Sequence, residues 1–283
     1  MSAHPQGRRA ALALFAALAA LLATGPQTID ATAAVPMRAA PGVCLLSQQG
    51  EPLDRAWRPD MRAAVAYARA RRGDIAFALR TPGSFYAYRP DHREWSASVL
   101  KAMLLVAYLD RPSVASRALN SHDNALLHPM ITRSDNDAAD TVDTIVGADG
   151  LRALARRVGM TEFTPAEPIW GESEISPRDQ TRFFLHIESD VVARHRAYAM
   201  HLLASIVPSQ RWGVGQVAPH GWKLYFKGGW GSGTGLIDNQ VVLLRRGCAR
   251  ISIAVLSMDD GSHAYGKQTL KGLFARLLRG LPK

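Results

Sequence analysis

The sequence has few of the residues that build metal sites, disulfide frameworks or membrane spans. It holds two cysteines, and its nine histidines show neither the H-E-x-x-H spacing nor a similar one, so we predict no metal and no other cofactor. The apolar run over residues 10–23 is shorter than the ~20 residues needed to span a bilayer. Its glycine-rich stretches lack the G-K-[ST] setting of a phosphate-binding loop.

The charge is strongly basic but spread along the chain. The 34 lysines and arginines outnumber the 24 acidic residues, which gives a formal net charge of +10. No basic block alternates with aromatic residues, so nucleic acid is not the expected partner. The balance instead favours anionic surroundings, such as a cell wall or a phospholipid surface.

The first 33 residues read as a secretory signal peptide. Arg8 and Arg9 precede the short apolar run, and Ala31-Thr32-Ala33 forms an A-x-A cleavage site. We therefore expect cleavage near Ala33 and a secreted or cell-envelope protein. The paired arginines leave the general secretory route and the twin-arginine route both open.

Export permits a disulfide between the two cysteines. Cys44 lies in a strand-like segment, and Cys248 lies in a turn between two predicted strands. We expect a bridge that ties the N-terminal extension to the sheet. Two buried thiols are the alternative.

The periodic segments predict a sheet interrupted by helices. The fold class is α/β (α+β), an antiparallel five-stranded sheet flanked by N- and C-terminal helices with an inserted all-helical domain. The sheet domain would cover residues 34–97 and 210–283, the helical domain residues 98–209, and the active site the cleft between them. The predicted strands are 74–80, 84–88, 222–227, 235–244 and 250–258, with the flanking helices at 59–71 and 265–279.

One lysine stands out in an apolar run. Lys101 is the only charge between Ala97 and Leu109, a run that is apolar on every face of a helix. Ser98 precedes it by three residues, so both side chains share one helix face. Burial lowers the pKa of an amine, which would make Lys101 a proton acceptor and Ser98 an activated nucleophile. The alternative is a lysine whose head reaches the surface.

Two further motifs follow in order. Ser134-Asp135-Asn136 carries S-D-N, and Lys227-Gly228-Gly229 carries K-G-G at the end of a strand-like run. The order S-x-x-K, S-D-N, K-[ST]-G is that of class A β-lactamases and penicillin-binding proteins. From about Pro59 to its C-terminal helix, the chain resembles the penicillin-recognising serine hydrolases, most closely the class A β-lactamase-like group of actinobacterial type.

The resemblance implies roles for the catalytic residues. Ser98 would attack the carbonyl, Lys101 would take or relay its proton, and Ser134 would pass a proton to the leaving nitrogen. An ordinary helix N-cap is the alternative for S-D-N.

The resemblance also implies substrate contacts. Asn136 would hold Lys101 and the substrate amide, Lys227 would attract a substrate carboxylate, and Gly229 would border the substrate. The backbone amides of Ser98 and Trp230 would form the oxyanion hole. The alternative for K-G-G is a strand that simply ends in a turn.

Two features depart from the family pattern. The middle residue of K-[ST]-G supplies a hydroxyl, and here it is Gly228; Ser232 or Thr234 could replace it. The loop that carries the water-directing glutamate, residues 162–176, looks shortened. Of its glutamates, Glu167, Glu172 and Glu174 could assist, although none lies in the family's local pattern and all three can equally be solvated loop carboxylates.

These observations predict an exported, monomeric serine hydrolase that opens β-lactams through a Ser98 acyl-enzyme. A small-molecule β-lactam or a peptidoglycan-type peptide is the expected partner. A D-Ala-D-Ala-type peptidase or another acyl hydrolase with slow β-lactam deacylation is one alternative. A noncatalytic binding module that keeps the fold is another.

Overall fold

The computed structural model describes Leu53, residues 57–231 and residues 236–282. All of them belong to one compact unit, which runs from Cys44 to Lys283. The predicted signal peptide, Cys44, Ser232 and Thr234 lie outside the described residues. No helix in the described part of the chain is long and apolar enough to cross a membrane.

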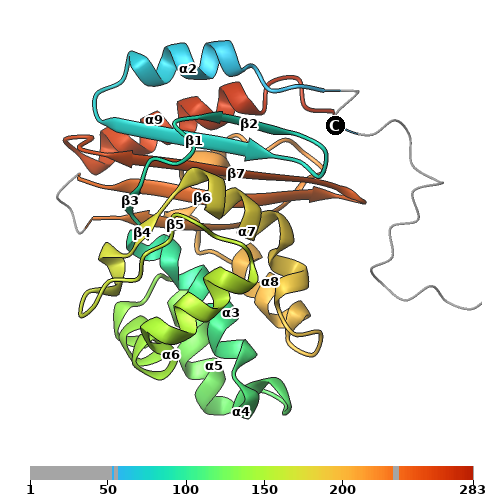
Figure 1. The fold of residues 1–283 in the computed structure, drawn as a ribbon. Coiled ribbons are helices and arrows are strands. Elements are labelled where there is room, and N and C mark those ends of the chain that lie inside the picture. Colours follow the sequence, from blue (N-terminus) through green and yellow to red (C-terminus); the bar gives the residue numbers. More distant parts are fainter. Residues whose placement is uncertain (1–52, 54–56, 232–235, 283) are drawn as a thin grey trace, which may run out of the picture. The chain divides into compact units, whose positions relative to one another are not determined.

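Five antiparallel strands form the central sheet, in the order β2-β1-β7-β6-β5 (Figure 1). The predicted five-stranded antiparallel sheet is confirmed. Each central strand has a long buried run, which fits a sheet that is covered on both faces. The strands are β1 (Asp74–Arg80), β2 (Phe85–Tyr88), β5 (Lys223–Trp230), β6 (Asp238–Arg246) and β7 (Ala249–Met258).

Helices cover the sheet on its two faces. The first described helix, α2 (Met61–Arg69), packs on the last, α9 (His263–Leu277), and both contact the sheet. Each begins at a side-chain cap, Asp60 for α2 and Ser262 for α9. On the other face, α7 (Pro177–Asp190) packs against β1, β6 and β7 (Figure 1).

The remaining helices lie together on the α7 side (Figure 1). At their centre is α3 (Lys101–Asp110), which follows the short 3-10 helix η1 (Ala97–Leu100) and contacts its neighbours directly. Gly147, with φ of 67°, kinks the longest helix. The neighbours are α4 (Pro112–Ala115), α5 (Ser121–Thr132), α6 (Asn136–Arg157) and α8 (Arg196–Ala204).

The segment predicted to be all-helical also contains a strand. Residues of β4 (Glu174–Ile175) pair with β3 (Glu94–Trp95) in a two-stranded antiparallel ladder. This short ladder joins the end of the loop over residues 162–176 to the chain just before Ser98. The domain boundaries at 97/98 and 209/210 stay a prediction.

Candidate active site

The β3–β4 ladder and the central sheet together position Ser98. The Ser96 amide donates to Ser173 O at 2.8 Å, and Asn239 Nδ2 donates to Trp95 O at 2.7 Å. Ala97 then adopts φ of 42°, a left-handed conformation that costs energy in a residue with a side chain. The turn leads directly into η1, whose second residue is Ser98.

Lys101 is fully buried and faces the S-D-N motif. Its Nζ donates to Ser134 O at 2.6 Å, to Asn136 Oδ1 at 2.7 Å and to Ser134 Oγ at 3.4 Å. The ring of Trp170 lies 5.0 Å from the same amine. The alternative of a lysine that reaches the surface is therefore wrong. The Ser98 hydroxyl makes no hydrogen bond to another described residue.

The S-D-N motif combines a helix cap with contacts to Lys101. Asp135 caps α6 by accepting from the Ala138 amide at 2.9 Å, so the capping reading holds for this residue. Ser134 and Asn136 remain directed at Lys101. Ser134 itself has φ of 59°, so it is a second residue held in a left-handed conformation at this site.

Lys227 reaches the same hydroxyl from the sheet. It is 1% exposed, and its Nζ lies 3.0 Å from Ser134 Oγ and 2.8 Å from Gly228 O. Ser134 Oγ therefore lies between two buried amines, Lys101 on a helix and Lys227 on a strand. The three sequence motifs meet at this hydroxyl.

Burial shifts the pKa of both amines downward. It lowers the pKa of Lys101 to about 8, and the carboxylates of Asp135 and Asp140 offset part of that shift. Burial and the adjacent charge of Lys101 hold the pKa of Lys227 well below its usual range. A pKa near neutrality suits Lys101 to accept a proton.

Strand β5 approaches the start of η1 very closely at Gly229. A Cβ there would lie 2.8 Å from Ser96 O and Val99 N and 2.9 Å from Ser98 N, so only glycine fits. K-G-G lies inside β5, which continues to Trp230, so the alternative of a strand that ends in a turn is wrong. The close approach brings β5 beside the Ser98 backbone.

The missing hydroxyl at Gly228 has a packing reason. A Cβ at this position would lie 3.1 Å from the indole of Trp212, which is buried. Trp212 in turn packs edge-on against Trp230 and His263, and His263 stacks on Trp230. An aromatic cluster therefore borders the strand where the family pattern has a hydroxyl.

Ser98 and Asn136 line a cleft of about 580 Å³. Trp230, at the end of β5, and Asp140, one turn after Asn136 on α6, line it too. The Trp170 indole nitrogen donates to Asp140 Oδ1 at 2.6 Å and so fixes the ring over Lys101.

The three loop glutamates lie in different surroundings. Glu172 lines the cleft, and Glu174 pairs with Arg93 at 3.4 Å on an exposed surface. Glu167 is exposed and does not line the cleft, although its charge contributes to the raised pKa of Asp143. None of the three has a hydrogen bond to Lys101, Ser98 or Ser134 among the described residues.

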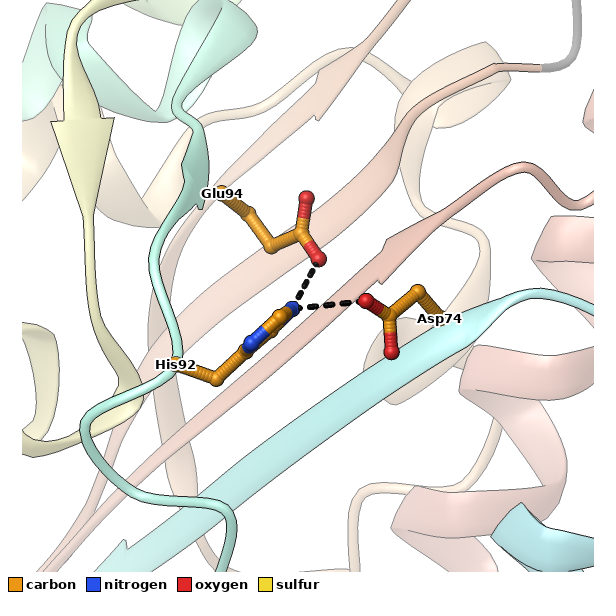
Figure 2. A group of neighbouring side chains, drawn as sticks. All are labelled: Asp74, His92 and Glu94. Atoms are coloured by element: carbon orange, nitrogen blue, oxygen red, sulfur yellow. Dashed lines mark hydrogen bonds and ion pairs between the residues drawn. The ribbon is translucent and has the colours of Figure 1, made fainter.

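One cluster elsewhere has residue types that bind metals. Figure 2 shows the Nε2 atom of His92 between Asp74 Oδ2 at 2.9 Å and Glu94 Oε1 at 2.6 Å. Arg89 donates to His92 Nδ1 at 2.9 Å and also pairs with Asp74. A ring that accepts at Nδ1 carries its proton on Nε2, where a metal would have to bind. The geometry fits an ion-pair network between β1 and β3 better than a metal site.

The sequence profile of the beta-lactamase enzyme family matches residues 123–278, more than half of the chain. The chain belongs to the beta-lactamase enzyme family. The match includes the S-D-N and K-G-G motifs and begins after Ser98 and Lys101, which the fold brings to the same site. No curated protein matches the sequence.

Solved beta-lactamase structures share the fold. A beta-lactamase from Sphaerobacter thermophilus superposes with a TM-score of 0.69 at 18% identity, covering 78% of this chain and 97% of that one. The class A beta-lactamase of Mycobacterium abscessus gives 0.65 at 17% identity, covering 78% and 98%. The structure of L2 complexed with relebactam gives 0.65 at 17% identity, covering 77% and 97%.

Trp230 was predicted at the site, but two other aromatic residues there, Trp170 and Trp212, were not. Trp170 lies in a loop without a motif, and Trp212 is distant from K-G-G in sequence. The position of Asp140 at the site could have been predicted, because it follows Asn136 by four residues and a helix places such residues on one face. Nothing in the sequence pairs His263 with Trp230.

Proposed function

We propose that this member of the beta-lactamase family is an exported serine hydrolase that opens β-lactam amides through an acyl-enzyme at Ser98. The observation that carries the proposal is the convergence of two buried amines, Lys101 and Lys227, on the Ser134 hydroxyl beside a cleft lined by Ser98. Buried lysines are costly, and their joint placement on one hydroxyl suits proton transfer.

The contacts support the following steps of acylation. Ser98 Oγ attacks the lactam carbonyl carbon while the neutral Lys101 amine takes the hydroxyl proton. The backbone amides of Ser98 and Trp230 receive the developing oxyanion. As the C–N bond breaks, Ser134 Oγ gives its proton to the leaving nitrogen and regains one from the protonated Lys101.

Deacylation requires water to attack the ester carbon and release Ser98 Oγ with its proton restored. A carboxylate base in the loop would speed this step. Trp170 rather than a glutamate covers Lys101. This observation favours the second candidate, a D-Ala-D-Ala-type peptidase or other acyl hydrolase that loses a β-lactam acyl group slowly.

The test is the intact mass of the mature protein, beginning near Ala34, over time after mixing with a penicillin and a cephalosporin. A Ser98-dependent adduct that forms and disappears with turnover supports the β-lactamase. A persistent adduct, absent in Ser98→Ala, supports the peptidase-like candidate. No adduct with either compound would overturn the β-lactam proposal and leave the noncatalytic module or another substrate.

A further inference from the structure

The apolar surface of the described chain concentrates at the cleft. Three large hydrophobic side chains are exposed there: Trp95 at 43%, Ile169 at 54% and Leu236 at 46%. No other large hydrophobic side chain among the described residues is as exposed. They come from β3, from the loop before η2 (Trp170–Glu172) and from the chain just before β6. Exposed apolar groups that gather at one concave site mark a binding surface.

The charged lining of the same cleft is acidic. Asp140 and Glu172 are the charged side chains that line it, and no lysine or arginine does so among the described residues. A substrate carboxylate would meet two like charges here.

Lys227, the lysine expected to attract a carboxylate, is already engaged. It is 1% exposed, and its Nζ contacts Ser134 Oγ and Gly228 O. Gly228 supplies no hydroxyl beside it, and the Trp212 ring lies 3.1 Å from the position that a Cβ would take there. Among the described residues, therefore, neither the lysine nor a hydroxyl of the family's carboxylate anchor lines the cleft.

The neighbouring strand does not replace that anchor. In register, β6 places Asp238 opposite Trp230, Asn239 opposite Gly229, and Gln240 opposite Gly228. Asn239 binds Trp95 O and the Ser257 amide, and Gln240 binds the backbone at residues 212 and 214. Asp238 is buried against His263. No cation reaches K-G-G from this strand.

We infer that the cleft selects acyl donors that carry an apolar side chain and no carboxylate beside the scissile bond. This inference rests on the proposed Ser98 acyl-enzyme and narrows its substrate class. An apolar group contacts Trp95, Ile169 and Leu236, while the part of the substrate near Asp140 and Glu172 is uncharged or cationic. The acidic form of a β-lactam binds less well than its ester.

The deciding experiment compares benzylpenicillin with its methyl ester. The second-order rate constant for formation of the Ser98 adduct, read by intact mass, is divided by the alkaline hydrolysis rate of the same compound. This constant reports acylation only, so slow deacylation does not disturb it. We expect the ester to acylate about tenfold faster, a difference equal to about 1.4 kcal/mol. An acid that acylates as fast as the ester, or faster, would overturn the inference.

Charge reversal in the cleft gives an independent reading. Glu172→Lys should move the ester-to-acid ratio toward the acid by about tenfold. The matched control is Asp149→Lys, because Asp149 is 99% exposed and does not line the cleft. This control makes the same change in net charge and should leave the ratio unchanged. Equal shifts of the ester-to-acid ratio in both variants would mean that the overall charge of the protein sets the preference for the ester. That result would refute a role for the acidic lining of the cleft.

The apolar contact is tested with a second pair of esters, one with a benzyl and one with a methyl side chain. Ile169→Ser and Leu236→Ser should each reduce the preference for benzyl several-fold, since each removes apolar contact area. An unchanged preference in both variants would contradict the apolar part of the inference. If neither penicillin nor its ester forms an adduct, the proposed function itself fails, which is distinct from an adduct with the opposite preference.

Discussion

Ser134 Oγ carries one proton and lies between two amines that cannot both be charged at low cost. Lys101 retains the help of Asp135 and Asp140, whereas the fully buried Lys227 has the charge of Lys101 beside it. The neutral form of Lys227 is therefore favoured. With Lys227 neutral, the protonated form of Lys101 is the neighbour that can return a proton to Ser134, which suits the proposed transfer of a Ser134 proton to a leaving nitrogen.

Lys101→Met separates catalysis from stability. The pKa of Lys101 falls from 10.5 in the unfolded chain to about 8, so unfolding takes up a proton between those pH values. Its charge thus opposes folding by about 3 kcal/mol below pH 8, and this cost fades as pH rises to 10.5. Asn136 lines the cleft, so water can replace the lost donor. We expect acylation to be abolished and the melting temperature at pH 7 to be equal or higher.

The wild-type acylation rate should also rise through about pH 8, as the Lys101 amine becomes neutral. Lys223→Met is the control, because Lys223 is exposed on β5 and should alter neither quantity. Adduct formation across pH and thermal unfolding measure both effects. A large fall in melting temperature with acylation retained would exclude Lys101 as the proton acceptor.

At the scale of elements, a buried acid fixes α9 against the sheet. Asp238 begins β6, and its Oδ1 lies 2.6 Å from Nδ1 of His263, the first residue of α9. Gly266 lets α9 approach, because a Cβ there would lie 2.0 Å from Asp238 Oδ2. Burial and the nearby Asp260 raise the pKa of Asp238 to about 8. His263 also stacks on Trp230, so this contact supports the end of β5.

Asp238→Asn should remove a pH dependence of stability. A folded pKa of about 8, against 3.8 unfolded, means that the folded state binds more protons between these values. Wild-type stability from this group is therefore present below pH 4 and is lost as pH rises toward 8, by at most about 1.4 kcal/mol per pH unit. Asparagine keeps the shape and does not titrate, so the variant should gain stability relative to wild type as pH rises from about 4 to about 8. Urea unfolding measures this gain, and Asp149→Asn is the exposed control. If the difference in unfolding free energy between variant and wild type is the same at every pH, the raised pKa of Asp238 is contradicted.

The elements show which parts of the fold the sequence could predict. Strand β1 has the bounds that its apolar run predicts. It pairs with β2 on one side and β7 on the other, so its apolar residues are buried in the middle of the sheet. Strand β5 runs three residues further than expected, since pairing with β6 overrides the weak strand preference of Gly-Gly-Trp. The three motifs could be found from local spacing, and the structure brings Lys101, Ser134 and Lys227 together. The reason for Gly228 could not be seen, because it lies in the packing of Trp212 from a distant segment.

At the scale of the whole molecule, the net charge of the protein is positive, whereas the charged side chains that line its cleft are negative. The formal charge of +10 attracts anionic surfaces over a Debye length of about 10 Å or less at physiological salt. The cleft presents Asp140 and Glu172 at contact distance from a substrate, where screening is weak. A basic protein with an acidic cleft can therefore associate with an anionic envelope and still prefer substrates without a carboxylate.

The predicted disulfide between Cys44 and Cys248 would also act on the whole molecule, because it would tie the N-terminal extension to the sheet. Cys248 lies in the turn between β6 and β7, whereas Cys44 lies outside the described residues, so the bridge stays a prediction. Joining these positions closes a loop of roughly two hundred residues, worth about 5 kcal/mol in the chain-entropy model. We expect the exported protein to show no alkylatable thiol without reductant and two after denaturation with reductant. Cys44→Ser and Cys248→Ser should lower the melting temperature equally, and the double variant should be no less stable than either, because each change removes the same bond. Additive losses would instead indicate two separately packed thiols.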